Sequence, residues 1–173
     1  FTFFISIFLF FVSLWLIFLT DKGRLFRDSL FLKVPVFGKI INQNVLSKFG
    51  KTFGILVGSG VPVLDTMHLT QKVVDNRVYE LAISKSAKHI ENGTSISDAL
   101  KLNGIFPGVF IQLMQTGEET GEIDKLSLKI SEFYAKQVNA TVDRLTSIIE
   151  PALIILIGAV VGIILIAVYM PIF

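Results

Sequence analysis

Cysteine is absent from the sequence, which excludes disulfide bonds, thiol nucleophiles and thiolate metal ligands. Histidine is scarce: His68 and His89 are the only two, they lie on different expected helices, and they do not form an HExxH pair. A GxxxxGK[ST] loop is also missing, so the chain does not bind a nucleotide through a P-loop. We therefore interpret both histidines as ordinary surface or core residues, and we predict neither an enzyme nor a cofactor.

Charge is missing from both ends of the sequence. Residues 1–19 and 151–173 contain no charged side chain, and all sixteen Lys and Arg and all fourteen Asp and Glu lie between Asp21 and Glu150. About 20 apolar residues cross the hydrocarbon core of a bilayer as a helix. Both uncharged runs are therefore predicted to be transmembrane helices, surrounded by membrane lipid.

The first apolar run differs from a secretory signal peptide, because it has no basic segment before it and no small-residue cleavage site. The sequence begins inside this run, at Phe1, so we expect an N-terminal part to precede it in a longer protein. Residues 20–41 form a basic juxtamembrane linker. Its five basic residues lie close to the first span, so the positive-inside rule predicts a multi-pass protein with a cytoplasmic central region and both chain ends outside.

The net charge of +2 is too small to indicate binding to nucleic acid, and no basic patch alternates with aromatic residues. We therefore predict that nucleic acid is not a partner.

The central region, residues 42–150, is predicted to be all-α. Apolar residues recur at three- and four-residue spacing, and no stretch shows the alternation of a strand. Breaker residues divide the region into six helices joined by short corners, which favours a compact bundle. The expected helices are 42–59, 62–74, 76–91, 95–102, 107–117, and a last helix that runs from Glu122 without a breaker to Pro151 and continues into the final span. The apolar residues expected to face inward include Val78, Leu81, Ala82 and Ile90 on 76–91, Val109 on 107–117 and Phe133 on the last helix.

Several local signals mark the corners of this bundle. Pro35 and Gly38 are expected to end the linker segment, and the sequence SGVP places a corner at Gly60 and Pro62. Asp75 or Asn76 is expected to cap a helix, and Ser95 with Asp98 resembles a capping box. Gly54 and Gly58 lie four residues apart, a spacing that lets another helix approach closely.

An acidic cluster, MQTGEETGEIDKL, is the only group of carboxylates in the sequence that resembles a site. Glu118, Glu119 and Glu122 lie within five residues, between Gly117 and Gly121. Three interpretations are open: a corner with an interaction surface, a purely structural corner, or a weak metal or catalytic site. The cluster lacks the ligand series of an EF-hand, and carboxylates at an exposed corner would be mostly solvated. We favour a shaped corner that also contacts a partner.

The final span contains two further features. Glu150 directly precedes Pro151, where a kink is expected because proline lacks a backbone donor. The carboxylate there either has a function at the membrane entry or lies among the headgroups. Gly158 and Gly162 form a GxxxG pattern, which favours packing against another span or self-association.

Several stretches together resemble one family, the type II secretion F family, which includes the inner-membrane platform proteins of type IV pili. Their order and spacing make the match specific. They are FGKTFGILVGSGVPVLDTM at 49–67, GTSISDAL at 93–100, FPGVFIQLMQTGEETGEIDKL at 106–126, and IIEPALIILIGAVVGIILIAVYMPIF at 148–173.

The resemblance implies a bacterial inner-membrane scaffold without enzymatic activity. Family members contain two similar cytoplasmic domains and three spans, and this chain resembles the second half. The implied partners are a cytoplasmic assembly ATPase, pilin or pseudopilin subunits, other platform components and further copies of the protein. The residues implied to provide shape and contacts are Gly60, Val61, Pro62, Gly117, Glu118, Gly121, Leu126, Glu150, Pro151 and Pro171.

Three rival functions would each require features of their own. A transporter or channel subunit would need polar groups within the spans, and the sequence has no charged ones there. A membrane-anchored carboxylate enzyme would need a cation held by Glu118, Glu119 and Glu122. A sensor would need a signalling domain, for which the sequence gives no sign.

Overall fold

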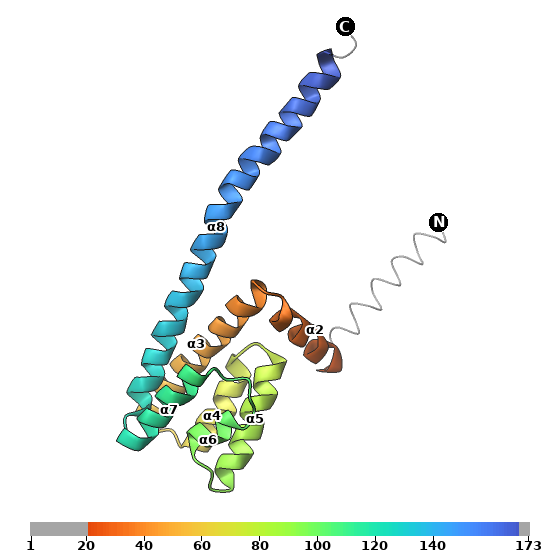
Figure 1. The fold of residues 1–173 in the computed structure, drawn as a ribbon. Coiled ribbons are helices and arrows are strands. Elements are labelled where there is room, and N and C mark those ends of the chain that lie inside the picture. Colours follow the sequence, from red (N-terminus) through yellow and green to blue (C-terminus); the bar gives the residue numbers. More distant parts are fainter. Residues whose placement is uncertain (1–20, 170–173) are drawn as a thin grey trace, which may run out of the picture. The chain divides into compact units, whose positions relative to one another are not determined.

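Every regular element in the described part of the chain is an α-helix. A computed structural model describes residues 21–169, so the predicted span at 1–19 and Pro171 lie outside the described residues. Seven helices are present there: α2 (Asp21–Lys33), α3 (Phe37–Gly58), α4 (Val63–Val73), α5 (Arg77–Glu91), α6 (Ile96–Lys101), α7 (Gly108–Thr120) and α8 (Ile123–Tyr169). Figure 1 shows this order. The predicted all-α class and the run of α8 into the apolar C-terminal segment are confirmed.

The chain divides into two compact units, with the boundary between Lys136 and Gln137. The first contains α2 to α7 and the first turns of α8, and its core is rich in aromatic side chains. Phe49 stacks on Phe53 with ring centroids 5.4 Å apart and meets Phe110 edge-on at 5.3 Å. All three are fully buried, so these rings hold α3 and α7 together.

Tyr79 brings a polar group into this core. Its ring meets Phe106 edge-on at 5.5 Å, and its hydroxyl lies 2.5 Å from Asn42 Oδ1 and 3.3 Å from the Ile105 carbonyl oxygen. Burial raises the pKa of the Tyr79 phenol well above its usual value. The tyrosine thus ties α5 to α3 and to the segment between α6 and α7.

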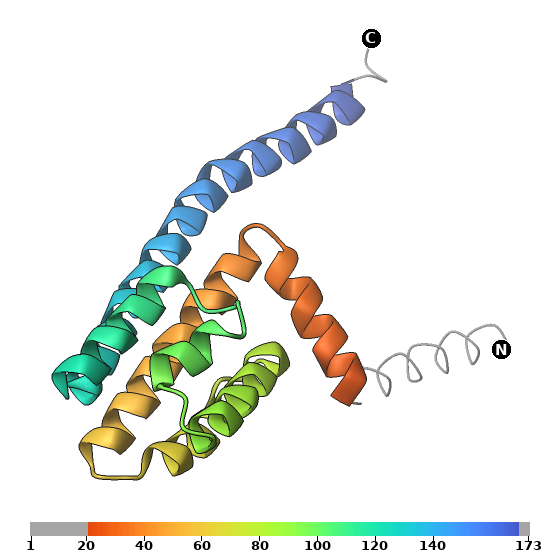
Figure 2. The ribbon, with the colours of Figure 1, turned by 60° about the horizontal axis from the view of Figure 1, so that its bottom comes forward.

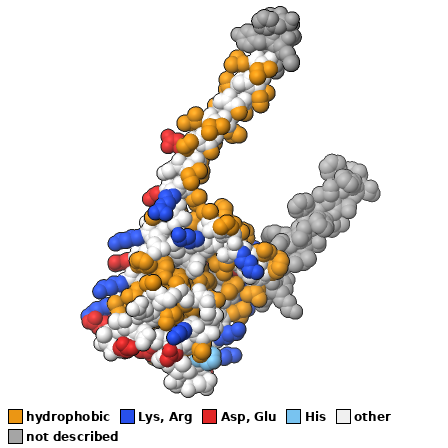
Figure 3. Space-filling model, viewed as in Figure 1, with side chains coloured by type: hydrophobic (Ala, Val, Ile, Leu, Met, Phe, Trp, Pro, Cys, Tyr) orange, Lys and Arg blue, Asp and Glu red, His pale blue; other side chains and the backbone are white. Residues whose placement is uncertain are grey.

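The second unit consists of the remainder of α8. The helix runs through Pro151, and the large apolar side chains described between Ile148 and Ile166 are all exposed. Figure 3 shows these side chains along the helix. Ile123–Ile166 is the one helix among the described residues that is long and apolar enough to cross a membrane, with a window of mean hydropathy 2.7.

Helix ends agree with the expected corners in most places. Gly60 has φ 82°, Val61 N–H donates to the Leu56 carbonyl at 3.0 Å, and Gly60 N–H donates to that of Val57 at 2.9 Å. This is the Schellman arrangement that ends a helix at glycine. Asn76 caps α5 by accepting bonds from Val78 N–H and Tyr79 N–H.

Two predicted helix boundaries were wrong. The expected helix 42–59 begins earlier, at Phe37, so Gly38 lies inside α3 and does not end the linker segment. A Cβ on Gly38 would lie 2.2 Å from the Leu32 carbonyl oxygen, so this glycine permits the close turn between α2 and α3. Gly117 does not break α7, which continues to Thr120.

Candidate functional site at the α7–α8 corner

The corner between α7 and α8 turns on Gly121. This residue caps α7 in the left-handed region, with φ 72° and ψ 13°. A side chain with a Cβ costs about 1–2 kcal/mol there. The chain then enters α8 at once, since Leu126 N–H donates to the Glu122 carbonyl oxygen at 3.0 Å. Leu126 itself is half-buried.

Gly117 makes the corner tight rather than ending the helix. It is buried, and a Cβ on it would lie 2.8 Å from the Cα of Ile123. The last turn of α7 therefore lies against the backbone of the first turn of α8. A larger residue at 117 would have to separate the two helices.

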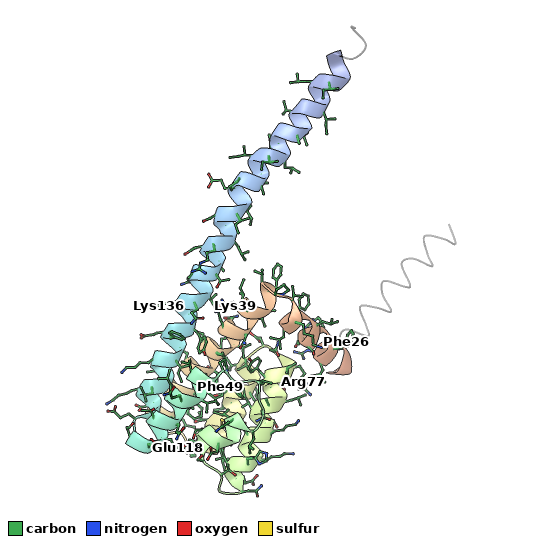
Figure 4. All side chains as sticks on the ribbon, viewed as in Figure 1. Phe26, Lys39, Phe49, Arg77, Glu118 and Lys136 are labelled. Atoms are coloured by element: carbon green, nitrogen blue, oxygen red, sulfur yellow. The ribbon has the colours of Figure 1, made fainter. Side chains whose placement is uncertain are left out.

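The carboxylate of Glu118 has its partners inside the molecule. One oxygen accepts a bond from Ile96 N–H at 2.8 Å, and the other accepts bonds from Ser97 N–H at 3.1 Å and Ser97 Oγ at 2.9 Å. These amides are the free donors at the start of α6, where a negative charge is favourable. Glu118 of α7 therefore caps α6. Figure 4 labels Glu118 near this end of the bundle.

The start of α6 has a second cap from its own sequence. Ser95 Oγ accepts a bond from Asp98 N–H at 3.2 Å and donates to Asp98 Oδ2 at 2.9 Å. The cap expected at Ser95 is thus present, and its hydroxyl, rather than its backbone N–H, holds the Asp98 carboxylate. Glu118 accepts bonds from the two amides that Ser95 leaves unpaired, those of Ile96 and Ser97.

The other two glutamates of the cluster are exposed and point to different partners. Glu119 accepts a bond from Gln115 Nε2 at 2.8 Å, and Glu122 pairs with Lys125 Nζ at 2.6 Å. Within residues 21–169, no three acidic, histidine or cysteine side chains are placed to hold a metal ion. A shallow polar cavity of about 290 Å³ lies beside the corner, lined by Ser95, Ser97, Asp98, Gln115, Glu118 and Glu119.

A glycine seam joins α3 to the first turns of α8; we define it as Ser47, Gly50 and Gly54. A Cβ on Gly50 would lie 2.6 Å from the Ser127 carbonyl oxygen, and one on Gly54 would lie 2.8 Å from that of Asp124. Ser47 Oγ donates to the Ser131 carbonyl oxygen at 3.0 Å. Figures 1 and 2 both show α3 alongside this part of α8.

Of the glycine pair expected to permit close packing, only Gly54 lies in tight contact. A Cβ on Gly58 would meet the Asp124 side chain at 3.4 Å, an ordinary distance. Sequence reasoning missed Ser47 and Gly50, although the spacing of Gly50, Gly54 and Gly58 was a readable signal.

The candidate residues of the final span lie on the second unit. Glu150 and Pro151 are exposed on α8. A Cβ on Gly158 or Gly162 would meet nothing within 4 Å, so this GxxxG face is open in the described chain.

Comparisons with known proteins match most of the chain. A family model described as "Type II secretion system (T2SS), protein F" matches residues 49–171. The type IV pilus assembly protein PilC of Myxococcus xanthus is 40% identical over 152 residues, which cover 88% of this chain and 36% of that protein. The protein of the same name from Pseudomonas aeruginosa is 30% identical over 158 residues, 90% of this chain and 42% of the relative.

A relative from the secretion branch matches a similar stretch. The type II secretion system protein F of Pseudomonas aeruginosa is 28% identical over 144 residues, 83% of this chain and 36% of the relative. The chain thus spans well under half the length of the curated relatives described here.

Proposed function

Because the chain belongs to the type II secretion system protein F family, we propose that it is part of an inner-membrane platform protein of a type II secretion or type IV pilus machine. Its role there is structural and mechanical rather than enzymatic. It couples a cytoplasmic assembly ATPase to the extraction and polymerisation of pilin-like subunits. Family membership favours this function over that of a transporter or channel subunit.

The proposed mechanical coupling rests on one observation, the continuity of α8. The helix begins at Ile123, at the glycine seam, and is still helical at Tyr169 within the apolar segment. A continuous helix is the stiffest connection that a single chain provides between a bundle and a span. Movement imposed on the bundle would be passed on along the helix rather than absorbed in a loop.

The α7–α8 corner is proposed to be a contact surface for another component of the machine. The carboxylate of Glu118 is used inside the molecule, so the side chains available to a partner are the exposed Glu119, Thr120 and Glu122. Thr120 donates only to the Thr116 carbonyl oxygen of its own helix, at 2.8 Å. A side chain at position 120 can therefore be replaced without breaking a contact between helices.

The test is photo-crosslinking in native cells, with a photoreactive amino acid replacing Thr120 in the full-length protein. We expect adducts to the assembly ATPase, to a second copy or to another platform component. Lys88, exposed on α5, is the matched control position. If position 120 yields no protein adduct while the control position 88 crosslinks efficiently, the corner is internal architecture and the contact surface lies elsewhere.

Self-association and the membrane topology are also part of the proposal. Two transmembrane helices, at 1–19 and 151–173, hold a cytoplasmic bundle with both ends of this segment outside. The open face at Gly158 and Gly162 supports contact with a further span or a second copy. A disulfide formed in membranes by Gly158→Cys, and absent for Val160→Cys on the opposite side of the helix, would support contact at this face.

A further inference from the structure

Helix α2 and the turn that follows it expose an unusual amount of apolar surface. Within thirteen residues, seven large apolar side chains are exposed: Leu25, Phe26, Leu30, Phe31, Val34, Val36 and Phe37. The two extreme cases are aromatic, with Phe26 64% and Phe37 61% exposed. So many exposed apolar side chains within one short stretch indicate a binding surface.

Basic side chains are interleaved with these apolar ones. Arg24, Lys33 and Lys39 are all exposed, and Figure 4 labels Phe26 on α2 and Lys39 near the start of α3. The one acidic residue between positions 23 and 39, Asp28, is buried and does not offset them at the surface. This stretch, which we call the basic–apolar segment (residues 23–39), is therefore positively charged and apolar at once.

Asp28 fixes which side of α2 faces the bundle. Its Oδ2 accepts a bond from Arg77 N–H at the start of α5 at 2.9 Å, and its Oδ1 accepts one from Arg27 Nε at 3.1 Å. Beside this attachment lies a cavity of about 400 Å³, with Phe31 and Phe37 in its wall. These two rings are therefore not packed on all sides, and they can turn outward without leaving a filled core.

We propose that the basic–apolar segment lies on the surface of a bilayer rich in anionic phospholipid. The apolar side chains enter the boundary between headgroups and acyl chains, and the basic side chains pair with lipid phosphates. This inference rests on the proposed membrane location of the chain and deepens it. It adds a membrane contact of a different kind, made in the plane of the membrane.

The mixture of side chains favours a bilayer over a second protein surface. In a dry protein interface, each interleaved Arg or Lys would have to give up its hydration or find a carboxylate partner. At a membrane surface these long side chains keep their charged ends among the headgroups while their neighbours are buried. In the sequence, moreover, α2 directly follows the uncharged run 1–19.

The test uses the intact chain in lipid nanodiscs, with spin labels at single introduced cysteines. The native sequence has no cysteine, so no background labelling occurs. Labels at Phe26→Cys and Phe37→Cys report whether the basic–apolar segment lies in lipid or in water. Leu69→Cys, exposed on α4, is the aqueous control, and Ile157→Cys on the apolar part of α8 is the membrane control. The readout is collision with oxygen compared with a water-soluble nickel chelate.

In nanodiscs of phosphatidylcholine with phosphatidylglycerol, labels 26 and 37 should favour oxygen over the nickel chelate, as label 157 does, while label 69 does not. In phosphatidylcholine alone this preference should weaken. Replacing Arg24, Lys33 and Lys39 with Gln should shift the equilibrium of the segment from bound to free by roughly a hundredfold, since each basic residue near an anionic surface contributes roughly fivefold. An unchanged circular dichroism spectrum would show that these variants remain folded.

Other outcomes would overturn the inference. If labels 26 and 37 match label 69 while label 157 lies in lipid, the segment does not bind the membrane, although the proposed membrane location stands. If label 157 is also aqueous, the membrane location itself is wrong. Strong coupling between spins at position 26, with no dependence on lipid charge, would assign the segment to contact with a second copy.

Discussion

Removing the Glu118 carboxylate should unfold α6 locally before it affects the rest of the bundle. Glu118 is the acceptor for three donors at the start of this six-residue helix. Isolated helices of this length are not stable in water, so α6 depends on its caps and its packing. Glu118→Ala removes the acceptor from α7, and Ser95 remains as the only cap.

The magnitude follows from the burial of the donors. Ile96 and Ser97 are 8% and 5% exposed, so water replaces the lost acceptor only in part. A buried donor left without a partner costs about 1–3 kcal/mol, and two amides lose theirs. Two such losses amount to about 2–6 kcal/mol, and because water replaces the acceptor in part we expect α6 to lose about 2–4 kcal/mol of local stability. Glu118→Gln keeps one carbonyl oxygen but loses the charge, so we expect about half that loss.

The assay is hydrogen–deuterium exchange of the intact chain in detergent micelles, followed by mass spectrometry. Exchange speeds up about tenfold for each 1.4 kcal/mol of local stability that is lost. Peptides from α6 should therefore exchange roughly thirtyfold or more faster in Glu118→Ala. Peptides from α4 should change little, and Glu119→Gln is the matched control, because this exposed carboxylate bonds only within its own helix. Equal exchange of α6 in both variants would refute the capping role.

Three further predictions concern the stability of the chain in detergent, measured by thermal unfolding. Gly50→Ala should cost about 1–3 kcal/mol because its Cβ would enter the Ser127 carbonyl oxygen, whereas Gly58→Ala should be neutral or slightly stabilising; equal effects would contradict the glycine seam. Gly121→Ala should cost about 1–2 kcal/mol and Gly121→Asn less, because asparagine tolerates the left-handed region; an undisturbed melting temperature for Ala would show that this conformation is not required. Burial raises the pKa of Tyr79 in the folded state above its unfolded-state pKa of about 10. The neutral phenol therefore contributes fully to the free energy of unfolding below about pH 10, and this contribution is lost as pH rises toward the folded-state pKa. Tyr79→Phe should remove that part of the pH dependence, and a wild-type melting temperature that stays flat between about pH 9 and 11 would contradict the assignment.

Helix boundaries were predictable wherever the residue at the corner determines the backbone conformation. Gly60 and Gly121 both have positive φ angles, and Asn76 and Ser95 both cap helices as their sequence context indicates. These features depend on neighbours within four or five residues. Local sequence therefore contains the information that fixes them.

Gly117 shows where local reasoning fails. A glycine within a helical pattern has two explanations, a break in the helix or a close approach by another chain segment. The approach of Ile123 is a tertiary contact, so the sequence alone did not distinguish between them. The role of Glu118 was hidden for the same reason, since its partners precede it by more than twenty residues.

The buried face of α5 is displaced by about one residue along the helix from the face that the sequence predicts. Val78, Leu81, Ala82 and Ile90 were expected to point inward, but Leu81 is exposed and the buried residues are Tyr79, Ala82, Ile83, Ser86 and Ala87. Val109 and Phe133 were also expected inside and are exposed. Each of these helices has apolar residues on more than one side, so the apolar stripe does not define a single inward direction.

The glycine seam also has a mechanical consequence for the first unit. Most helix contacts are cushioned, because leucine or methionine side chains change rotamer when a helix shifts. At Gly50 and Gly54 α3 contributes no side chain of its own, and its backbone lies against the carbonyl oxygens of Ser127 and Asp124, with only the side chains of Ile130 and Leu128 beside them. The seam therefore has very little compliance, so a displacement of residues 124–131 carries α3 with it. The softer element at the other end of α3 is α2, which borders a cavity and holds the bundle through Asp28.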